Sequence, residues 1–575
     1  MNASSKASRP TVQALRDRPQ ADVLIVGGGI NGIATFRDLA LQGVDVALVE
    51  RGDYVSGASS ASSHMVHGGV RYLENGEFRL VKESVTERNR LVRNAPHYVK
   101  PLPTTIPIHR TFSGILAAPF RLLVTHGRGK PRERGALLIK AGLLMYDTFS
   151  RDGGAVPRHR FRGRRRSREL FPDLDERFRY TATYYDASMH DPERLALDVL
   201  RDGVREDAAR AANYASVIGA DGASALIRDE LTGEEFPFHA KVVVNTSGPW
   251  TDLTNAALGQ PTRFMGGTKG SHIVLDNPEL LAATRGNEIF FEASDGRIVL
   301  IYPLKGRVMV GTTDVDADPR TATVCTDDEI GYFFDLIAQV FPHIAVEREQ
   351  IVYTFSGIRP LPRHDDVAPG FVSRDYRIEQ ARLGGAEGVP VLSLVGGKWT
   401  TFRALSEHLA TEVMTLLGRT RTVSTTDLAI GGGAGFPRTD DDRTAWLEAN
   451  RGVHSIEFAD RMLDRYGTYA AELLTELPAT QRPLAHAAGY SREEIALLAE
   501  REEVVTLVDL LLRRTSVAFV GGVTAQTLAE IAAAAAPALG WDDAEVEQQI
   551  AAAAGILRDA HRIDVDTAAL APQRA

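Results

Sequence analysis

Apolar and polar residues near the start of the chain follow the order of a strand, a turn, a helix and a second strand. Residues 23–26 are all apolar, as in a parallel strand that is buried on both faces. Three glycines follow between residues 27 and 32 at G-x-G-x-x-G spacing, and residues 34–41 suit a helix. A second apolar run covers residues 44–49. This order predicts a βαβ unit that binds a dinucleotide.

Each glycine of the turn has a separate expected role. Gly27 permits the tight turn, Gly29 lets the backbone approach a pyrophosphate, and Gly32 lets the helix pack against the strand. The N–H groups at the start of the helix would then face the phosphates. Glu50 follows the second apolar run, where a carboxylate can accept both ribose hydroxyls. The alternative is an ordinary glycine-rich turn, with Glu50 as a solvated strand end.

Later apolar runs return to this pattern twice. One run ends at Asn245 and stops at small residues, as a strand does when its carboxyl end faces a ligand. Another run, at residues 391–395, precedes a helix that extends to residue 416. Between them, residues 265–315 hold short strand-like pieces separated by glycine, which favours a separate antiparallel sheet. The run that ends at Asn245 covers residues 241–245, and the pieces within 265–315 include 270–275, 298–302 and 308–313. Two further β-compatible runs precede them, at residues 212–217 and 223–229.

From residue 440 onward, Ala, Leu, Glu and Arg dominate with a period near 3.6, which predicts helices. The fold class is therefore α/β: a Rossmann-like dinucleotide-binding domain interleaved with an antiparallel-sheet domain, plus a C-terminal all-helical domain. Residues 431–435 are interpreted as part of a linker, because Pro437 follows them instead of a helix. The expected bounds are a flexible tail at 1–20, a core at 21–420, a linker at 421–439 and a helical cap at 440–575. Within the core, the cofactor-binding parts are expected at about 21–107, 190–260 and 350–420. The substrate parts are expected at about 108–189 and 261–349.

Composition narrows the class of protein. The chain has 575 residues, more than one hydrophobic core usually supports, and its 44% hydrophobic and 25% charged content is typical of a soluble globular protein. A net charge of -9 argues against a general nucleic-acid binder. Cys325 is the single cysteine, so neither an intrachain disulfide nor a Cys-x-x-Cys redox pair is expected, and no metal site is predicted. Lys140 interrupts the best apolar run, residues 136–146, which is too short for a membrane span.

A second complete nucleotide fingerprint is missing from the sequence. An enzyme that reduces a flavin with NADPH usually shows two such strand, glycine turn and helix units. We therefore expect a bound flavin to take its electrons directly from an organic substrate.

Seven further motifs lie in order within residues 21–403, and together they resemble the FAD-dependent glycerol-3-phosphate dehydrogenases. Arg513-Arg514-Thr515, within residues 509–515, also resembles the helical cap of that family. The motifs are SSASSHMVHGGVRYL at 59–73, NTSGPW at 245–250, KGSH at 269–272, GTTD at 311–314, SGIRP at 356–360, SRDY at 373–376 and GGK at 396–398.

The resemblance implies that the Rossmann-like domain is an FAD-binding domain and that the antiparallel sheet forms a substrate domain. It also implies that the protein oxidises sn-glycerol 3-phosphate to dihydroxyacetone phosphate. Hydride would move from C2 to the flavin, and the electrons would pass to membrane quinone. The resemblance also implies a cytoplasmic enzyme that binds peripherally to the inner face of the cell membrane. It does not decide whether the protein forms a homodimer. The implied cofactor-binding residues are Gly27, Gly29, Ile30, Asn31, Gly32, Glu50, Arg51, Ser59, Ser60, Ser62, Ser63, His64, Gly68, Gly248, Trp250, Gly397, Lys398, Trp399 and Thr400.

A doubly charged phosphate requires several fixed cations, and arginine suits it because of its planar fork. Four basic residues lie within the matched motifs, on or beside glycine-rich turns. Arg71, Arg374 and Lys398 are assigned to the phosphate, and Arg359 to the substrate hydroxyl or the developing carbonyl, where a cation stabilises the oxygen. Lys398 has the alternative role of holding the flavin, and each of the four has the alternative of a solvated surface position.

His67 is the expected proton acceptor for the substrate hydroxyl, because neutral imidazole titrates near the working pH. The alternative is a hydrogen bond from this histidine to the isoalloxazine. His64 stands where the family usually has Lys or Arg, so a permanent charge near the cofactor is lost. Thr312 or Thr313 is expected to offer a hydroxyl to the ligand, although a plain turn pair is the alternative. Arg513 and its neighbour Arg514 are interpreted as structural or domain-interface arginines.

Residues 119–168 concentrate positive charge and interleave it with apolar pieces in helical rhythm. This pairing favours contact with an anionic membrane surface, with a solvated loop and RNA binding as alternatives.

Other functions remain open at this point. They are a glycerol-3-phosphate oxidase that uses oxygen, an amine or amino-acid oxidase in which Arg359 clasps a carboxylate, and a non-enzymatic flavin-binding membrane scaffold.

Overall fold

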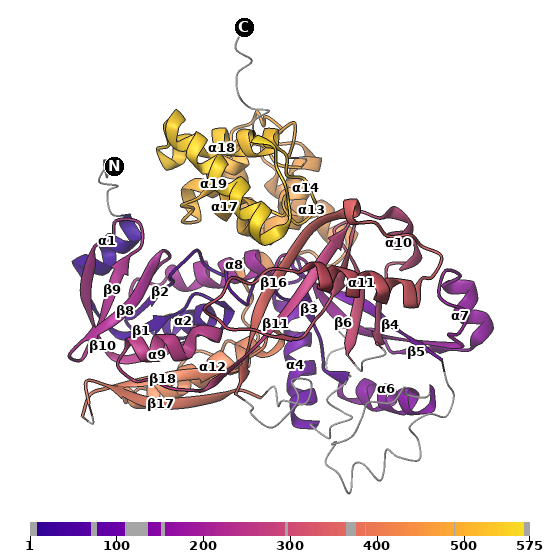
Figure 1. Ribbon diagram of the computed structural model, residues 1–575. Helices are drawn as coiled ribbons and strands as arrows, with labels where there is room; N and C mark the ends of the chain where they lie inside the picture. The colour runs from indigo at the N-terminus through magenta and orange to yellow at the C-terminus, as the bar shows by residue number, and fades with distance from the viewer. Residues whose placement is uncertain are drawn as a thin grey trace, which may run out of the picture.

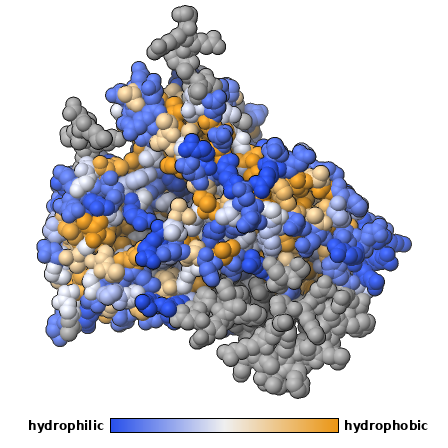
Figure 2. Space-filling view, viewed as in Figure 1, coloured by the Kyte–Doolittle hydropathy of each residue, from blue (hydrophilic) through white to orange (hydrophobic). Residues whose placement is uncertain are grey.

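The computed structural model describes residues 9–70, 78–109, 136–150, 156–293, 297–363, 375–385, 387–487 and 489–567. Within these ranges the chain forms two β-sheets with flanking helices, and a helical C-terminal domain, the cap, lies over both sheets (Figure 1). Apolar and hydrophilic residues are interspersed over the face drawn in Figure 2. Among the described helices, none combines the length and the apolar character that crossing a bilayer requires.

The first sheet has a parallel centre, and its middle strands are buried. Val23 and Ile25 of β1, and Val244 of β10, have no exposed surface, as expected for strands covered on both faces. Helices α2 (Ile30–Leu41), α8 (Pro192–Val204) and α12 (Phe402–Leu416) pack into the same core. The Rossmann-like prediction is confirmed. In sheet order the parallel strands are β18 (Val389–Val395), β10 (Glu235–Asn245), β1 (Gln20–Val26), β2 (Val46–Val49) and β7 (Ala209–Ala212), and β17 (Arg377–Leu383), β8 (Ala215–Asp221) and β9 (Ser224–Asp229) pair antiparallel at the margins.

The second sheet is antiparallel within the described residues, except where β4 and β12 run parallel. Helix α11 (Asp327–Val340) packs Ile330 and Phe333 against Ile273 and Val310 of this sheet. The antiparallel-sheet prediction is therefore confirmed. Its strands are β15 (Val315–Asp316), β11 (Met265–Leu275), β14 (Arg307–Gly311), β13 (Ile298–Leu304), β12 (Glu288–Glu292), β4 (Val99–Ile108), β6 (Tyr180–Met189) and β3 (Met65–Val66), with β16 (Ile351–Pro362) beside β11 and β5 (Arg160–Arg162) beside β6.

Three of these strands, β3, β4 and β16, lie outside the expected substrate parts. β4 and β16 fall almost entirely within ranges assigned to cofactor binding, but they pair with β6 and β11 of the second sheet. An apolar run shows that a strand is buried, whereas its sheet is decided by partners far away in the sequence.

The predicted flexible tail is wrong for residues 10–17. Pro10–Asp17 forms helix α1, with Pro10 in its first turn. Val12 and Leu15 lie three residues apart on one face, and both are fully buried in the same core as Leu24 and Ala212. Burial of this pair against the first sheet stabilises a helix that would be marginal alone. Residues 1–8 lie outside the described residues.

The cap has its own hydrophobic core, and the predicted all-helical domain is confirmed. Arg513 and Arg514 both donate to Asp53 of the first domain, so their interpretation as interface residues is confirmed. The cap elements are α13 (Asp440–Asn450), α14 (Ile456–Tyr466), α15 (Ala470–Glu476), α16 (Arg492–Arg501), α17 (Leu507–Asp509), the π-helical turn η7 (Leu510–Arg514), α18 (Ala525–Leu539) and α19 (Asp543–His561).

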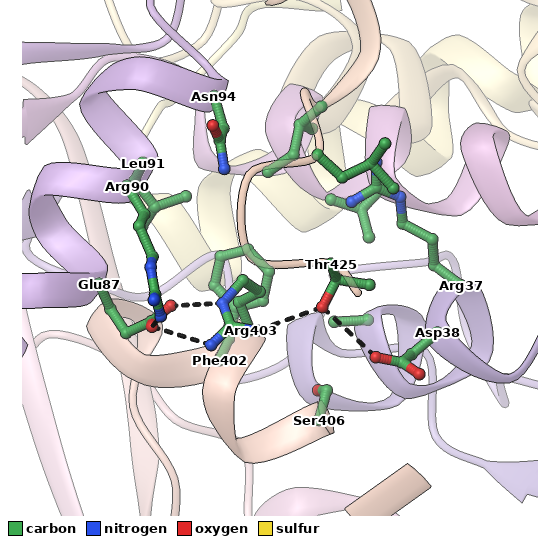
Figure 3. Close-up of a pocket in the computed structure, with 14 residues that line it drawn as sticks. Arg37, Asp38, Glu87, Arg90, Leu91, Asn94, Phe402, Arg403, Ser406 and Thr425 are labelled. Atoms are coloured by element: carbon green, nitrogen blue, oxygen red, sulfur yellow. Dashed lines mark hydrogen bonds and ion pairs between the residues drawn. The ribbon is translucent and has the colours of Figure 1, made fainter. Parts of the chain in front are cut away.

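A small cavity of about 20 Å³ lies between α2, α12 and α4 (Phe78–Asn94) (Figure 3). Arg403 of α12 donates to both carboxylate oxygens of Glu87 on α4, at 2.7 and 2.9 Å. Thr425 links Arg403 to Asp38 of α2, and Asp38 also pairs with Arg421. Charged bonds of this kind are short and directional, so they fix α2 relative to the two neighbouring helices.

Candidate active site

The glycine turn lies between the end of β1 and the start of α2. Gly28 N donates to Glu50 Oε2 at 2.7 Å, and Gly52 N donates to Glu50 Oε1 at 2.9 Å. Burial raises the pKa of the Glu50 carboxyl, although both amides oppose this shift. Ile30 N, in the first turn of α2, donates to Ser59 Oγ at 3.0 Å. Glu50 and Ser59 therefore lie at the edge of the turn where a dinucleotide would bind.

The packing of this turn is suited to FAD. A β-carbon added at Gly32 would lie 2.0 Å from the carbonyl oxygen of Gly27, so only glycine fits there. The start of α2 is thereby held against the strand, and the N-terminal end of a helix is the end that favours a pyrophosphate. Trp250, in the turn η1 (Gly248–Trp250), lies 5.4 Å from the guanidinium of Arg51. These residues fit a dinucleotide cofactor that extends from Glu50 across the helix start.

A second set of contacts joins the glycine turn to the second sheet. Trp399, in the turn η4 (Trp399–Thr401), donates from Nε1 to the carbonyl oxygen of Ser59 at 2.9 Å. A β-carbon at Gly357 of β16 would lie 2.4 Å from Cβ of Ala61. Ser63 Oγ lies 2.8 Å from Nε2 of His272 on β11. Gly397 packs against Asn31 in the same way. The segments at 27–32, 59–63, 357–359 and 397–400 are thus brought together in one region.

His67 directly follows β3 and is half-buried. The next residue, Gly68, donates its N–H to Asp186 Oδ1 at 2.8 Å. Asp186 also accepts from Tyr146 at 2.6 Å and from Arg88 at 3.1 Å, and this whole group is buried. A buried carboxylate with three donors is a fixed acceptor, so the backbone beside His67 is held in place.

Arg359 of β16 lies in a polar cluster at the end of β14. Its Nη1 donates to Asp314 Oδ1 at 2.8 Å, and its Nη2 donates to Thr312 Oγ1 and to the carbonyl oxygen of Thr313, both at 2.9 Å. Gly270 of β11 lies directly against the guanidinium. The cluster presents a cation of fixed orientation beside the loop that carries Ala61.

Beneath this cluster, Glu329 at the start of α11 joins β11 to the loop that follows β14. One of its oxygens accepts from Thr313 at 2.7 Å and from Ser271 at 2.8 Å, and the other accepts from Lys269 at 2.8 Å. Burial alone would raise the pKa of Glu329, but the hydrogen bonds from Lys269, Thr326, Thr313 and Ser271 lower it. The Thr313 hydroxyl is therefore engaged inside the protein, whereas Thr312 Oγ1 lies beside Arg359.

The side chain of His64 packs away from the glycine turn. Its ring centroid lies 5.2 Å from that of Phe519 in the cap and 6.0 Å from that of Phe355. It lines a cavity of about 30 Å³ between core and cap, which Lys305 and Asp191 also line. Burial lowers the pKa of His64 to about 4, so the ring is neutral at pH 7. The permanent cation of this region is Lys305, which pairs with Asp191 at 2.8 Å.

Two predicted phosphate ligands, Arg71 and Arg374, lie outside the described residues, as do residues 119–135 and 151–155 of the basic segment at 119–168. Lys398 directly precedes η4, beside Trp399 and the buried Thr400. The other predicted cofactor positions, Ser60, Ser62, Gly248 and Gly29, lie on the same loops as the residues above.

Sequence reasoning assigned no role to Asp186, His272, Asp314 or Glu329. His272 and Asp314 stand inside matched motifs, so closer attention to KGSH and GTTD would have found them. Glu329 carries a local signal, because Thr326 three residues earlier forms a capping box with it. Asp186 has no such signal, since its partners Arg88 and Gly68 are about a hundred residues away.

Comparisons with known proteins agree with this geometry. A family model described as FAD dependent oxidoreductase matches residues 22–402, and one described as the C-terminal domain of alpha-glycerophosphate oxidase matches residues 423–546. The chain is 32% identical over 553 residues to a glycerol-3-phosphate dehydrogenase of Synechocystis sp., covering 92% of this chain and 95% of that protein. It is 31% identical over 514 residues to D-erythritol 1-phosphate dehydrogenase of Brucella abortus, covering 86% and 94%.

A solved glycerol-3-phosphate dehydrogenase of Bacillus halodurans, complexed with FAD, has the same fold. Its TM-score is 0.70 at 21% identity, over 95% of this chain and 97% of that one. The chain therefore belongs to the FAD-dependent oxidoreductase family, as a member of the glycerol-3-phosphate dehydrogenase type whose cofactor is FAD.

Proposed function

We propose that the protein oxidises sn-glycerol 3-phosphate to dihydroxyacetone phosphate. The main support is the contact chain that joins the glycine turn, through Ser59 and Ala61, to β16 and the Arg359 cluster. Such a chain supports a site in which the cofactor and a cation of fixed orientation lie together. The relative from Synechocystis, named a glycerol-3-phosphate dehydrogenase, supports the choice of substrate.

Bound FAD supplies the acceptor for a hydride from C2 of the substrate. Arg359 lies with its guanidinium oriented by Asp314 and Thr312, and its charge stabilises the negative character that develops on the C2 oxygen. His67 accepts the hydroxyl proton as a neutral imidazole, and the anchored Gly68 next to it limits its movement. Arg71, Arg374 and Lys398 bind the phosphate, with a role for Lys398 at the flavin as the alternative.

The direct test is anaerobic bleaching of the purified yellow protein. With glycerol 3-phosphate we expect loss of the flavin absorbance within the mixing time of a manual assay, while glycerol and amino acids leave it unchanged. D-erythritol 1-phosphate belongs in the same series, because a relative carries that name. Bleaching by an amino acid would replace our proposal with an amino-acid oxidase, and a protein that no substrate bleaches would support the flavin-binding scaffold.

For the electron acceptor we propose membrane quinone, with oxygen as the competing choice. The reduced protein should be reoxidised by a soluble quinone under anaerobic conditions. Rapid formation of hydrogen peroxide in air, at the rate of substrate oxidation, would instead identify an oxidase.

Peripheral binding to the inner face of the cell membrane follows from the same proposal. Helix α6 (Ala136–Ser150) exposes 54% of Leu144 and 43% of Met145, and Phe78 of α4, which contacts α6, is 43% exposed. Exposed apolar side chains combined with a basic segment favour an anionic lipid surface.

Vesicles test this part separately. We expect the protein to pellet with vesicles containing anionic lipid at low salt, and Leu144→Glu to weaken pelleting severalfold, because it places a charge where apolar contact is needed. Val453→Glu is the matched control, since Val453 is 73% exposed on the cap. Equal pelleting of the two variants would remove α6 from the lipid contact.

Glu329→Gln tests the support of the Arg359 cluster. A neutral amide cannot accept from Lys269, Ser271 and Thr313 as the carboxylate does, so Thr313 should shift and kcat/KM should fall about 10-fold, the equivalent of about 1.5 kcal/mol. Steady-state kinetics alongside thermal unfolding measure this. Asp327→Asn, an exposed change in the same helix, is the control and should leave kcat/KM unchanged; equal values for both variants would contradict the assignment.

A further inference from the structure

Residues 50–55, here called the 50–55 loop, lie directly on the glycine turn. Glu50 accepts from Gly28 N at 2.7 Å, and Val55 N donates back to the carbonyl oxygen of Gly28 at 2.9 Å. The ring of Tyr54 packs on the same residue, since a β-carbon at Gly28 would lie 2.9 Å from Tyr54 Cδ1. The shape of this loop therefore determines where Glu50 stands relative to the turn.

The opposite side of the 50–55 loop is bound by the cap. Asp53 accepts from Arg513 and from both Nη1 and Nη2 of Arg514, the latter at 2.9 Å to Oδ1. Tyr54 donates its hydroxyl to Glu503 of the cap at 3.2 Å. Asn213 closes the group by donating to Asp53 at 2.9 Å and to the carbonyl oxygen of Glu503 at 3.0 Å.

This interface is buried, which makes its two sides interdependent. Asp53 is 2% exposed, Tyr54 1% and Arg514 0%. Burial alone would raise the pKa of Asp53, but Arg514 and Arg513 lower it to about 2, so the carboxylate is charged at neutral pH. Removing one charged partner while the interface stays closed would leave the other charge buried and unpaired. This costs far more stability than the loss of a surface ion pair.

We propose that the cap retains the cofactor: through Arg514 and Arg513 it holds the 50–55 loop in the shape that lets Glu50 bind the ribose of FAD. Arg514 and Asp53 are positioning residues in this arrangement, because they act on the cofactor through Glu50 and the glycine turn. The inference rests on the placement of FAD at that turn. Because binding free energies are reciprocal, FAD must also strengthen the docking of the cap.

The first test measures FAD binding to the full-length apoprotein by flavin fluorescence. We expect Arg514→Gln to raise the Kd for FAD about 10-fold, and Tyr54→Phe to raise it less, because Asp53 keeps its pairs there. Arg465→Gln is the matched control, since it breaks a buried ion pair with Glu494 inside the cap and leaves the interface intact. An Arg514→Gln protein with the Kd of the Arg465→Gln protein would overturn the proposal.

The second test needs no variant, so it still applies if the Arg514→Gln protein does not fold. Hydrogen exchange is compared between wild-type holoprotein and apoprotein. Removal of FAD should accelerate exchange of the amides at 507–514, which contact the loop, while those of α18 in the same cap keep their rates. Equal protection of 507–514 in both forms would overturn the proposal. The proposed reaction would survive that result, because substrate bleaching of the loaded protein tests it independently.

Discussion

Replacing Arg359 by alanine should lower kcat/KM for glycerol 3-phosphate by roughly 10²- to 10³-fold, the usual loss when one fixed donor to a developing oxyanion is removed. The planar guanidinium is oriented by Asp314, Thr312 and the carbonyl oxygen of Thr313, so its charge is in place before the reaction begins. Arg359→Lys should recover only part of the loss, because a single ammonium cannot reproduce the fork. Single-turnover reduction of the flavin under anaerobic conditions measures the effect on the chemical step.

The control for this change is Arg377→Ala on β17, which removes an exposed arginine paired with Glu379. It should leave the rate of reduction unchanged. If Arg359→Ala reduced the flavin at the wild-type rate, the cation would have to act elsewhere, and the assignment of Arg359 to the substrate oxygen would be wrong.

Gly32→Ala should weaken FAD binding by roughly 10- to 100-fold, from the 1–3 kcal/mol that overpacking a close contact costs. The new β-carbon would meet the carbonyl oxygen of Gly27 at 2.0 Å, and this backbone atom cannot move without opening the turn. The ratio of flavin to protein absorbance after purification reports the loss.

Gly331→Ala provides the matched comparison, because Gly331 also lies inside a helix but has open space around its Cα. Alanine should stabilise α11 slightly there, since glycine is a poor helix former. A Gly32→Ala protein that keeps full flavin content would show that FAD does not depend on close packing at this turn.

The parts of the fold that follow from local pattern could be predicted from sequence. The buried strands β1, β10 and β18 read as short apolar runs, and α12 follows its strand directly, as expected of a βα unit. The helical cap was evident from its 3.6-residue period. Helix α1 was missed because two apolar residues, Val12 and Leu15, are too weak a local signal, and its stability comes from the sheet on which it packs.

The residues of the candidate site also fall into two groups, those that spacing predicts and those that depend on distant partners. The spacing of Gly27, Gly32 and Glu50 indicates their roles, so their placement could be predicted from the sequence. Asp186 and Glu329 act only through partners that folding brings to them, and neither stands at a spacing that predicts those partners. The same limit applies to β4 and β16. Their local sequence predicts that they are strands, but the sheet that they join depends on distant partners.

The order of strands in the first sheet has a consequence for synthesis of the chain. β1 pairs with β2 nearby, but its other edge pairs with β10, where Gln20 stands opposite His239, and β10 in turn pairs with β18. At about 5–20 residues per second, the ribosome takes roughly 10–40 s to make the residues between these partners. Throughout that interval the Val, Leu and Ile residues of β1 have no partner strand on that edge, so the first sheet cannot be completed until β10 and β18 have been made.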